Sequence, residues 1–290
     1  MRLVVCVKAV PDPGIPLGTG PGHPAWDPSS WGWELNPSDG SALALALQLR
    51  GPAGTVTALS LGMQAPRALR RAVAGGADQA ILLADRVWED PDILMTARIL
   101  AAAASRVGCD AVLCGYTTLD GQGGSLPAVL AGFLDCPLVS PVVEAWVEAS
   151  GLVVRTRLAR GRRARLTPRL PAVLAVDGTP HRMEVSLPAH IRALTAPLEV
   201  WDDSALGLGS CATHVTYLGL EPPRPRPKKI FTPDSRLSAA ERLRQLMTGG
   251  RKEKQGELFT GSPGQAAEHI LGALRREGII PEGDQLKTDN

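Results

Sequence analysis

The chain of 290 residues lacks the features that mark membrane, secreted and metal-binding proteins. No apolar run reaches the roughly 18 residues of a membrane-spanning helix, so we expect no direct membrane insertion. The opening MRLVVCVKAV is too short, and too soon followed by Pro11, for a signal peptide. The five cysteines form no CxxC pair, so we expect neither a metal site nor a disulfide framework. We therefore expect a cytoplasmic protein.

Aromatic residues are also scarce, and the net charge is small. Aromatics make up 4% of the chain and the net charge is +2, which neither favours nor excludes nucleic acid as a partner. The 44% of apolar residues suffice for one large domain with an appendage. No Ser–His–Asp order and no paired carboxylates in a glycine frame indicate catalysis. We expect His181 and His190 to be surface residues rather than general bases.

The most informative stretch is 111–134, AVLCGYTTLDGQGGSLPAVLAGFL. Its apolar start predicts a strand buried on both faces, and Pro127 suits the first turn of a helix that runs to Leu134. The glycines between them leave backbone N–H groups accessible to an anion such as phosphate. The loop matches neither GxxxxGK[ST] nor GxGxxG, so a plain strand-to-helix turn remains the alternative.

Strands and helices alternate through the first 134 residues. Strands are predicted at 3–7, 55–61, 79–83 and 111–114, with helices between them. The long Pro- and Gly-rich excursion 11–33 interrupts this pattern, with a small hairpin expected around 26–35. The alternation predicts an α/β fold, a three-layer doubly wound and mainly parallel sheet with its ligand site at the carboxyl ends of the strands.

After Leu134 the pattern changes. Strands at 142–147, 152–158 and 172–177 follow one another through short turns, which predicts an antiparallel extension or edge of the sheet. Seven arginines lie between residues 155 and 169. They form either a surface for a partner or polyanion, or a hairpin with its arginines in water. The lack of aromatics in this run argues against nucleic acid.

The chain divides into an α/β domain at 1–200, a Pro-rich linker at 201–230 and a helical arm at 231–290. The segment 221–229 is a semi-rigid polyproline connector. Two short helices then begin at the capping boxes Ser238–Glu241 and Ser262–Gln265. Each has an apolar stripe that it cannot bury alone, so we expect the arm to pack on a partner subunit.

Several motifs, in this order, resemble the beta subunit of electron transfer flavoprotein. They are Val7-Lys8-Ala9-Val10-Pro11-Asp12, Leu35-Asn36-Pro37, Gly75-Gly76-Ala77-Asp78, Asp120-Gly121-Gln122-Gly123-Gly124-Ser125-Leu126-Pro127, Leu170-Pro171-Ala172-Val173 and Ser186-Leu187-Pro188. The tail from Arg224 onward resembles the long C-terminal arm of some bacterial members. Each motif is weakly specific alone, but their order and spacing cover nearly the whole chain.

The resemblance implies an electron carrier subunit with no bond-making chemistry of its own. Subunits of this family pair with an alpha subunit that carries the redox-active FAD. The beta subunit holds AMP, or a second FAD in electron-bifurcating members. The implied electron donor is a flavin-dependent dehydrogenase or another donor, and the implied acceptor is quinone-linked or of the ferredoxin type.

Carried over residue by residue, the resemblance implies a nucleotide pocket and a docking loop. The pocket residues would be Ala9, Asn36, Pro37, Ser38, Asp39, Leu61, Asp120, Gly121, Gln122, Gly123, Gly124 and Ser125. Ala9 would contact the adenine, and N–H groups from Gln122 to Ser125 would hold phosphate. Asn36 is alternatively only a helix cap, and Asp120 only a turn former.

The docking loop departs from the family pattern. It would comprise Asp177, Gly178, Thr179, Pro180, His181, Arg182 and Met183. The family's partner-anchoring leucine falls on Thr179, which leaves Met183 as the flexible apolar contact. The arginine run also replaces the family's acidic residues, so the electron donor is expected to differ from an acyl-CoA dehydrogenase.

Two other classes of function remain open. One is a stand-alone adenine-nucleotide-binding regulator or enzyme on the same α/β scaffold, because a fold does not fix a function. The other is a polyanion-binding protein that uses the arginine run and would show steep salt dependence.

Overall fold

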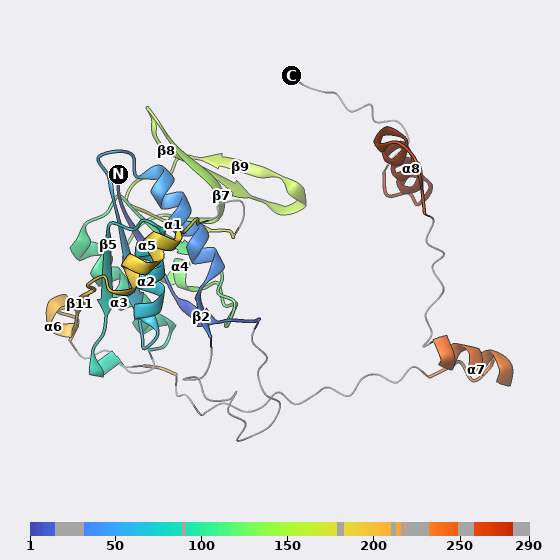
Figure 1. Ribbon diagram of the computed structural model, residues 1–290, viewed down its shortest axis with the longest axis horizontal. Coiled ribbons are helices and arrows are strands. Elements are labelled where there is room, and N and C mark those ends of the chain that lie inside the picture. The colour runs from blue at the N-terminus through green and yellow to red at the C-terminus, as the bar shows by residue number, and fades with distance from the viewer. Residues whose placement is uncertain are drawn as a thin grey trace. The chain divides into compact units, whose positions relative to one another are not determined.

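The computed structural model describes residues 1–14, 32–88, 91–178, 183–209, 213–215, 218, 232–248 and 258–280. Contacts divide the chain into two units, Met1–Pro223 and Arg224–Asn290. The first unit carries the sheet and its covering helices (Figure 1).

Among the described residues of the first unit, nine strands form the main sheet, in the order β11-β5-β4-β1-β6-β10-β7-β8-β9. They are β1 (Arg2–Cys6), β4 (Thr55–Leu61), β5 (Gln79–Leu83), β6 (Ala111–Gly115), β7 (Leu138–Glu148), β8 (Gly151–Arg157), β9 (Arg163–Leu166), β10 (Ala172–Val176) and β11 (Glu199–Trp201). Neighbours from β11 through β7 are parallel, and β7, β8 and β9 are antiparallel. The predicted α/β class with a mainly parallel sheet is confirmed.

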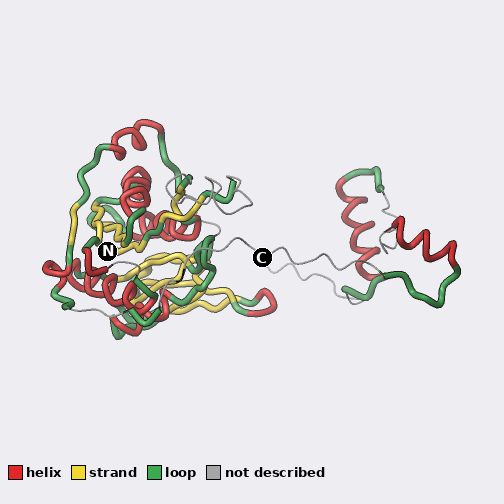
Figure 2. Tube along the Cα trace, turned by 90° about the horizontal axis from the view of Figure 1, so that it is seen from below, coloured by secondary structure: helices red, strands yellow, loops and turns green. Residues whose placement is uncertain are grey.

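Helices cover both faces of this sheet (Figures 1 and 2). The helices of the first unit are α1 (Pro37–Leu49), α2 (Ala65–Gly75), α3 (Ile93–Val107), α4 (Leu126–Phe133), α5 (Leu187–Leu194) and α6 (Asp203–Leu206). Residues of β1 alternate between two apolar clusters. Leu3 and Val5 pack with α1 and α2, whereas Val4 and Cys6 pack with α3 and α4. This alternation is the period of a strand that is buried on both faces.

The strand at 172–177 was expected at an antiparallel edge, and that expectation is wrong. β10 lies inside the sheet, parallel to β6 on one side and to β7 on the other. All five of its residues are buried, which the uninterrupted apolar run AVLAV requires of a central parallel strand. The antiparallel part is the extension β7–β8–β9, which protrudes from the sheet (Figure 1).

A separate two-stranded sheet lies beside the end of β1. β2 (Ala9–Pro11) pairs antiparallel with β3 (Trp33–Leu35). Residues 33–35, the end of the hairpin expected around 26–35, pair with β2, and residues 26–31 lie outside the described residues. The backbone thus leaves the main sheet after Val7, which turns Lys8 toward the carboxyl edge of that sheet.

The winding of the sheet reverses between β1 and β6. The chain moves from β1 to β4 and β5 on one side, and then crosses to β6 on the other side of β1. Helices that follow the two halves lie on opposite faces, so their loops separate above this point and leave a crevice. A ligand site is expected there from topology alone.

The second unit contains α7 (Ala239–Thr248) and α8 (Pro263–Arg276). The predicted capping box at Ser262 is present, with Gln265 N bonded to Ser262 Oγ and Ser262 N bonded to the Gln265 side chain. Apolar side chains of both helices are exposed, among them Leu243, Met247 and Ile270. In the first unit, Trp201 is the last residue of β11 and α6 follows it, so the first residues of the predicted linker 201–230 belong to a strand and a helix.

Candidate functional site

A cavity of about 390 Å³ opens at the β1–β6 crevice. Its walls come from the carboxyl ends of β1, β4 and β6 and from the first turns of α3 and α4. The lining residues are Cys6, Val7, Lys8, Asp39, Ser60, Leu61, Gly62, Pro91, Ile93, Thr96, Leu100, Cys114, Gly115, Tyr116, Thr117, Thr118, Gly123, Gly124, Ser125, Leu126 and Pro127. This volume lies within the range of small-ligand sites.

The glycine-rich loop after β6 forms one wall of the cavity. Gly123, Gly124 and Ser125 line it, directly before the first turn of α4. Gln122 and Gly124 have φ values of +49° and +59°, so the chain turns twice through the left-handed region within three residues. A Cβ on Gly123 would meet only Ser125 Oγ, at 3.8 Å, so this backbone faces open space.

Asp39, in the first turn of α1, ties the two strand ends together. Its Oδ2 accepts a hydrogen bond from Lys8 N at 2.9 Å, and its Oδ1 accepts one from Gly115 N at 3.0 Å. Burial raises the pKa of Asp39 to about 7, although hydrogen bonds from Asn36, Lys8 and Gly115 oppose that rise. The carboxyl group therefore lies between the first residues that follow β1 and the last residue of β6, and it lines the cavity.

Gly115 is required where it lies because α1 approaches it closely. A Cβ at this position would collide with Asp39 Oδ1 and would lie 2.8 Å from Ser38 Cβ. Any larger residue would push the start of α1 away from β6 and break the Asp39 hydrogen bond. The glycine that ends the apolar run is thus a packing requirement as well as a strand terminator.

Asn36 does not cap α1 with its side chain. It is almost completely buried and instead holds the loop after β6. Its Nδ2 donates to Thr117 O at 3.0 Å, and its Oδ1 accepts from Leu119 N at 3.2 Å. The amide therefore satisfies one carbonyl and one N–H of the loop together, and it fixes the loop against the start of α1.

Lys8 and Asp120 form an ion pair near the opening of the cavity, with Lys8 Nζ 2.6 Å from Asp120 Oδ2. Partial burial works to raise the pKa of Asp120, but hydrogen bonds from Lys8 and Thr118 lower it below its usual value. Lys8 is the one Lys, Arg or His among the described residues that line this cavity.

Cys6 and Cys114 occupy the floor of the cavity on neighbouring strands. A hydrogen bond with Cys114, together with burial, raises the pKa of the Cys6 thiol well above its usual value. Buried thiols behave as small apolar groups. They give the inner end of the cavity an apolar surface, alongside Leu61, Leu100 and Leu126.

The structure brings part of the predicted pocket together. Asp39, Leu61, Gly123, Gly124 and Ser125 line the cavity, and Asn36 and Asp120 hold its loop. Ala9, Pro37, Ser38, Gly121 and Gln122 do not line it. Ala9 is buried on β2, because the chain has already left the main sheet at that point. Cys6 of β1 lines the cavity instead of Ala9.

Sequence reasoning missed the contributions of the other strands and helices. Ser60, Pro91, Ile93, Thr96 and the pair Cys6 and Cys114 reach the cavity from separate parts of the chain. A signal existed for some of them. Cys6, Ser60 and Cys114 lie at or next to the end of a predicted strand, and such positions meet at the carboxyl edge of a parallel sheet.

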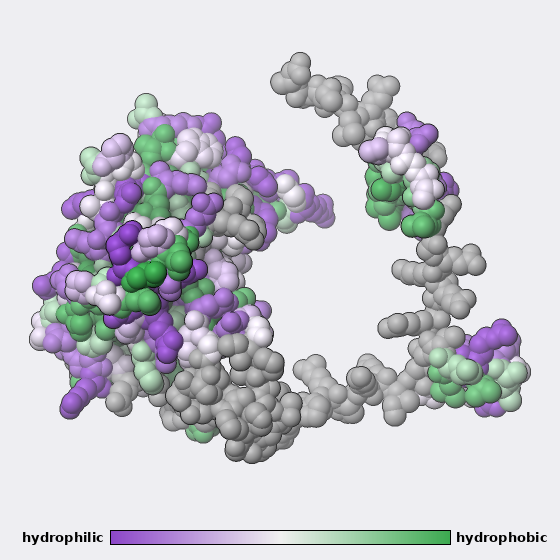
Figure 3. Space-filling model, viewed as in Figure 1, coloured by the Kyte–Doolittle hydropathy of each residue, from purple (hydrophilic) through white to green (hydrophobic). Residues whose placement is uncertain are grey.

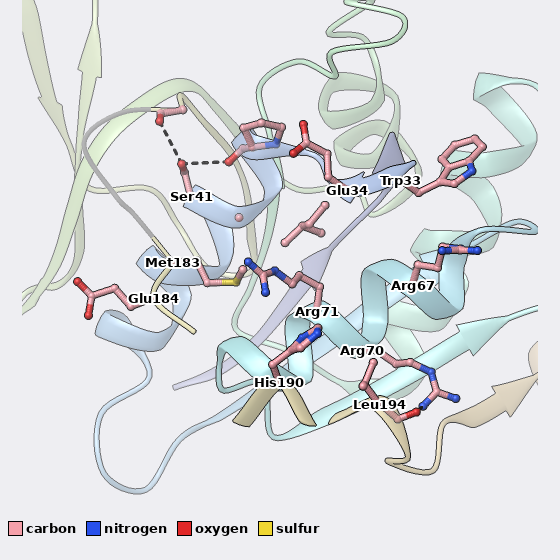
Figure 4. Close-up of a pocket in the computed structure, with 14 residues that line it drawn as sticks. Trp33, Glu34, Ser41, Arg67, Arg70, Arg71, Met183, Glu184, His190 and Leu194 are labelled. Atoms are coloured by element: carbon pink, nitrogen blue, oxygen red, sulfur yellow. Dashed lines mark hydrogen bonds between the residues drawn. The ribbon is translucent and has the colours of Figure 1, made fainter. Parts of the chain in front are cut away.

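A second and larger cavity, of about 1100 Å³, lies outside α1 and α2 (Figure 4). Arg67, Arg70 and Arg71 of α2 line it together with His190 of α5. Glu34, Glu184 and Trp33 also contribute. It lacks a glycine-rich loop, so it is a poorer candidate for a nucleotide than the smaller cavity.

The predicted docking segment borders this second cavity. Gly178 and Met183 line it, and Ser41 Oγ lies 3.1 Å from Gly178 O (Figure 4). Met183 is partly buried, with its sulfur so close to Gly75 that a Cβ there would collide with it. Asp177 pairs with Arg157 at 2.9 Å. Thr179, Pro180, His181 and Arg182 lie outside the described residues.

The apolar surface next to this segment belongs to α5. Leu187, Ile191 and Leu194 are 70%, 56% and 51% exposed, and their spacing puts them on one face of the helix. An apolar patch is visible over α5 in Figure 3. Helices α2 and α5 contain four arginines and no acidic residue, so this apolar stripe has basic surroundings.

The arginine run has acidic partners on β7. Arg155 and Arg163 pair with Glu144, at 2.6 and 3.5 Å, and Arg165 pairs with Glu148 at 2.7 Å. The guanidinium groups of Arg155 and Arg165 also lie over the Trp146 ring. Much of the run is thus neutralised within its own sheet, which weakens the case for a polyanion surface.

Within the described ranges, no group of three or more His, Cys, Asp or Glu side chains is arranged to hold a metal ion. The same residues include no helix with the length and apolarity needed to cross a bilayer.

The fold and the site define a doubly wound α/β protein with a small-ligand cavity at its switch point. The Electron transfer flavoprotein domain family matches residues 29–206. The electron transfer flavoprotein subunit beta of Thermoanaerobacterium thermosaccharolyticum is 30% identical over 85% of this chain and 87% of its own length. This chain belongs to the electron transfer flavoprotein family, as its sequence motifs predicted, and is of the beta, FixA-like type.

Two further relatives match over nearly their whole lengths. Protein FixA of Azorhizobium caulinodans is 28% identical over 95% of this chain and 99% of its own length. The caffeyl-CoA reductase-Etf complex subunit CarD of Acetobacterium woodii is 28% identical over 97% of this chain and 100% of its own length.

Proposed function

We propose that this chain is the beta subunit of a heterodimeric electron transfer flavoprotein and holds an adenine nucleotide in the β1–β6 cavity. The observation that carries the proposal is the glycine-rich loop at the topological switch point of a chain of this family. The nucleotide is AMP, or alternatively a second FAD. The redox FAD belongs to, or is shared with, the alpha subunit.

The donor set of the cavity fits an adenine nucleotide. Leu61, Ile93, Leu100 and the two thiols offer an apolar slot for a planar base. The hydroxyls of Ser60, Thr96, Thr117, Thr118 and Ser125 offer partners for ribose and phosphate. Backbone N–H groups of the loop, before the first turn of α4, favour an anion.

The residues that this chain supplies would position the nucleotide rather than react with it. Asp39 and Asn36 hold the strand ends and the loop in place, which is a binding role. AMP would supply no redox chemistry, whereas a second FAD would supply a second electron-accepting centre. This agrees with a carrier subunit that makes and breaks no covalent bond.

The partner surfaces form a second part of the proposal. An electron-donating protein, such as a flavin-dependent dehydrogenase, would dock at residues 177–183 and on the exposed stripe of α5. The acceptor would be quinone-linked or of the ferredoxin type, and no nucleic acid is involved. The helical arm 231–290, after the linker 201–230, would pack on the alpha subunit, since its apolar side chains are exposed. The complex would work in the cytoplasm.

Nucleotide content tests the proposal. The chain is co-expressed with a candidate alpha subunit, the complex is purified and denatured, and the released nucleotides are separated and quantified. One AMP and one FAD per heterodimer would indicate an ordinary carrier, and two FAD without AMP the bifurcating type. Absence of both a complex and a nucleotide would contradict the proposed function.

A further inference from the structure

Lys8 brings the one cation of the described lining residues to the β1–β6 cavity. It follows β1 directly, and its backbone N–H is already bound to Asp39. Its side chain is 52% exposed, so the ammonium group lies near the opening rather than in the apolar floor. A cation in this position faces the end of the cavity that the glycine-rich loop also borders.

The ammonium group of Lys8 is held by Asp120 of that same loop. Asp120 precedes the residues 121–124, which are exposed and which include both left-handed positions of the loop. Upstream of Asp120, Asn36 fixes Thr117 and Leu119. Asn36 and Lys8 thus both hold the loop from outside it, and the contact of Lys8 with Asp120 lies nearest to the glycine-rich residues 121–124.

We propose that Lys8 is a phosphate-binding residue of this cavity and that Asp120 is its internal counter-ion, with which an anionic ligand competes. The inference rests on the proposed function, since it requires that the cavity binds a nucleotide. It assigns Asp120 a role other than ligand contact. The carboxylate neutralises Lys8 while no phosphate is present, and a bound phosphate takes over the ammonium group.

This competition makes opposite predictions for the two members of the pair. Lys8→Gln removes the cation and weakens AMP binding about tenfold, as expected for loss of a charge-assisted hydrogen bond. Asp120→Asn frees the cation and tightens AMP binding about fivefold, the upper range for releasing an exposed ion pair. Adenosine has no phosphate, so its affinity stays within about twofold of the wild type in both variants.

The experiment titrates AMP and adenosine, by calorimetry, into the full chain after removal of any bound nucleotide. Arg50→Gln and Asp78→Asn are the matched controls. They break a comparable ion pair, 2.8 Å long, at the amino-terminal edge of the sheet. Neither control variant should change the affinity for AMP. A gain in affinity for Asp120→Asn cannot arise from poor folding, which keeps the test sharp.

The outcomes separate this inference from the proposed function. Binding of AMP that is equally tight in wild type and Lys8→Gln overturns the role of Lys8 and leaves the nucleotide site standing. Weaker AMP binding in Asp120→Asn shows that Asp120 only shapes the loop and overturns the competition. If the wild type binds neither AMP nor adenosine, both the proposed function and this inference fail.

Discussion

Asp39 offers the sharpest test of how the crevice is built. Its carboxylate accepts hydrogen bonds from Lys8 N and Gly115 N, one on each oxygen. Asp39→Asn preserves shape and removes the ionisation. The amide oxygen can accept only one of these bonds in this geometry, because the NH₂ group then faces the second N–H. Leaving a buried N–H unpaired costs about 1–3 kcal/mol at every pH.

The wild type carries a pH-dependent cost that the variant lacks. Burial raises the pKa of Asp39 from 3.8 to about 7. A pKa raised on folding means that the folded state holds the proton more tightly than the unfolded state does. Protonation of Asp39 therefore stabilises the wild type fully below about pH 4, and this stabilisation is lost as the pH rises to about 7. Each pKa unit corresponds to 1.36 kcal/mol, which gives about 4 kcal/mol over the whole window.

Urea unfolding of both proteins, followed by far-ultraviolet circular dichroism, measures this difference. Between about pH 5 and about pH 8, the free energy of unfolding of the wild type should fall by about 3 kcal/mol relative to Asp39→Asn. The stability of the variant relative to the wild type should therefore increase as the pH rises. Parallel pH profiles of the two proteins would refute a buried carboxyl at the base of the crevice.

Three further substitutions test other parts of the account. Asn36→Ala leaves Thr117 O and Leu119 N without their partner, so the free energy of unfolding should drop by about 2 kcal/mol and nucleotide content should fall. Gly115→Ala forces α1 away from β6 and should lower the melting temperature and abolish nucleotide retention; full retention would contradict the packing argument. Ile191→Asp places a charge in the exposed stripe of α5 and should slow electron transfer from the donor at least about tenfold. Val147→Asp, equally exposed on β7, is the matched control, and equal slowing by both variants would exclude α5 as the docking surface.

The sheet could be predicted where local pattern and tertiary role agree. The strands expected at 3–7, 55–61, 79–83 and 111–114 correspond to β1, β4, β5 and β6. The strand at 172–177 was found, but its neighbours were not. Pairing is a non-local property, and the turns around 142–158 suggested a hairpin that would take in all three strands. The uninterrupted apolar run AVLAV of β10 was the better signal in the sequence for a central position in the sheet.

For the site as well, features that are continuous in sequence could be predicted, whereas contacts between distant residues could not. The glycine-rich loop and Asp39 were identifiable because their motifs are continuous in sequence. The roles of Asn36 and Asp120 were not, because each acts on a partner more than 80 residues away. The cavity floor, with Cys6 beside Cys114, depends on the register of two strands and becomes visible only once that register is known.

We propose that the nucleotide occupies the cavity beside the loop after β6. Gly123→Arg tests it directly, because the backbone there tolerates a Cβ and the long side chain would fill the cavity. Gly121→Arg is the matched control, since Gly121 is exposed in the same loop and does not line the cavity. Nucleotide released from the purified complex should be lost in Gly123→Arg and unchanged in Gly121→Arg. Normal nucleotide content in Gly123→Arg would show that the nucleotide does not bind in this cavity.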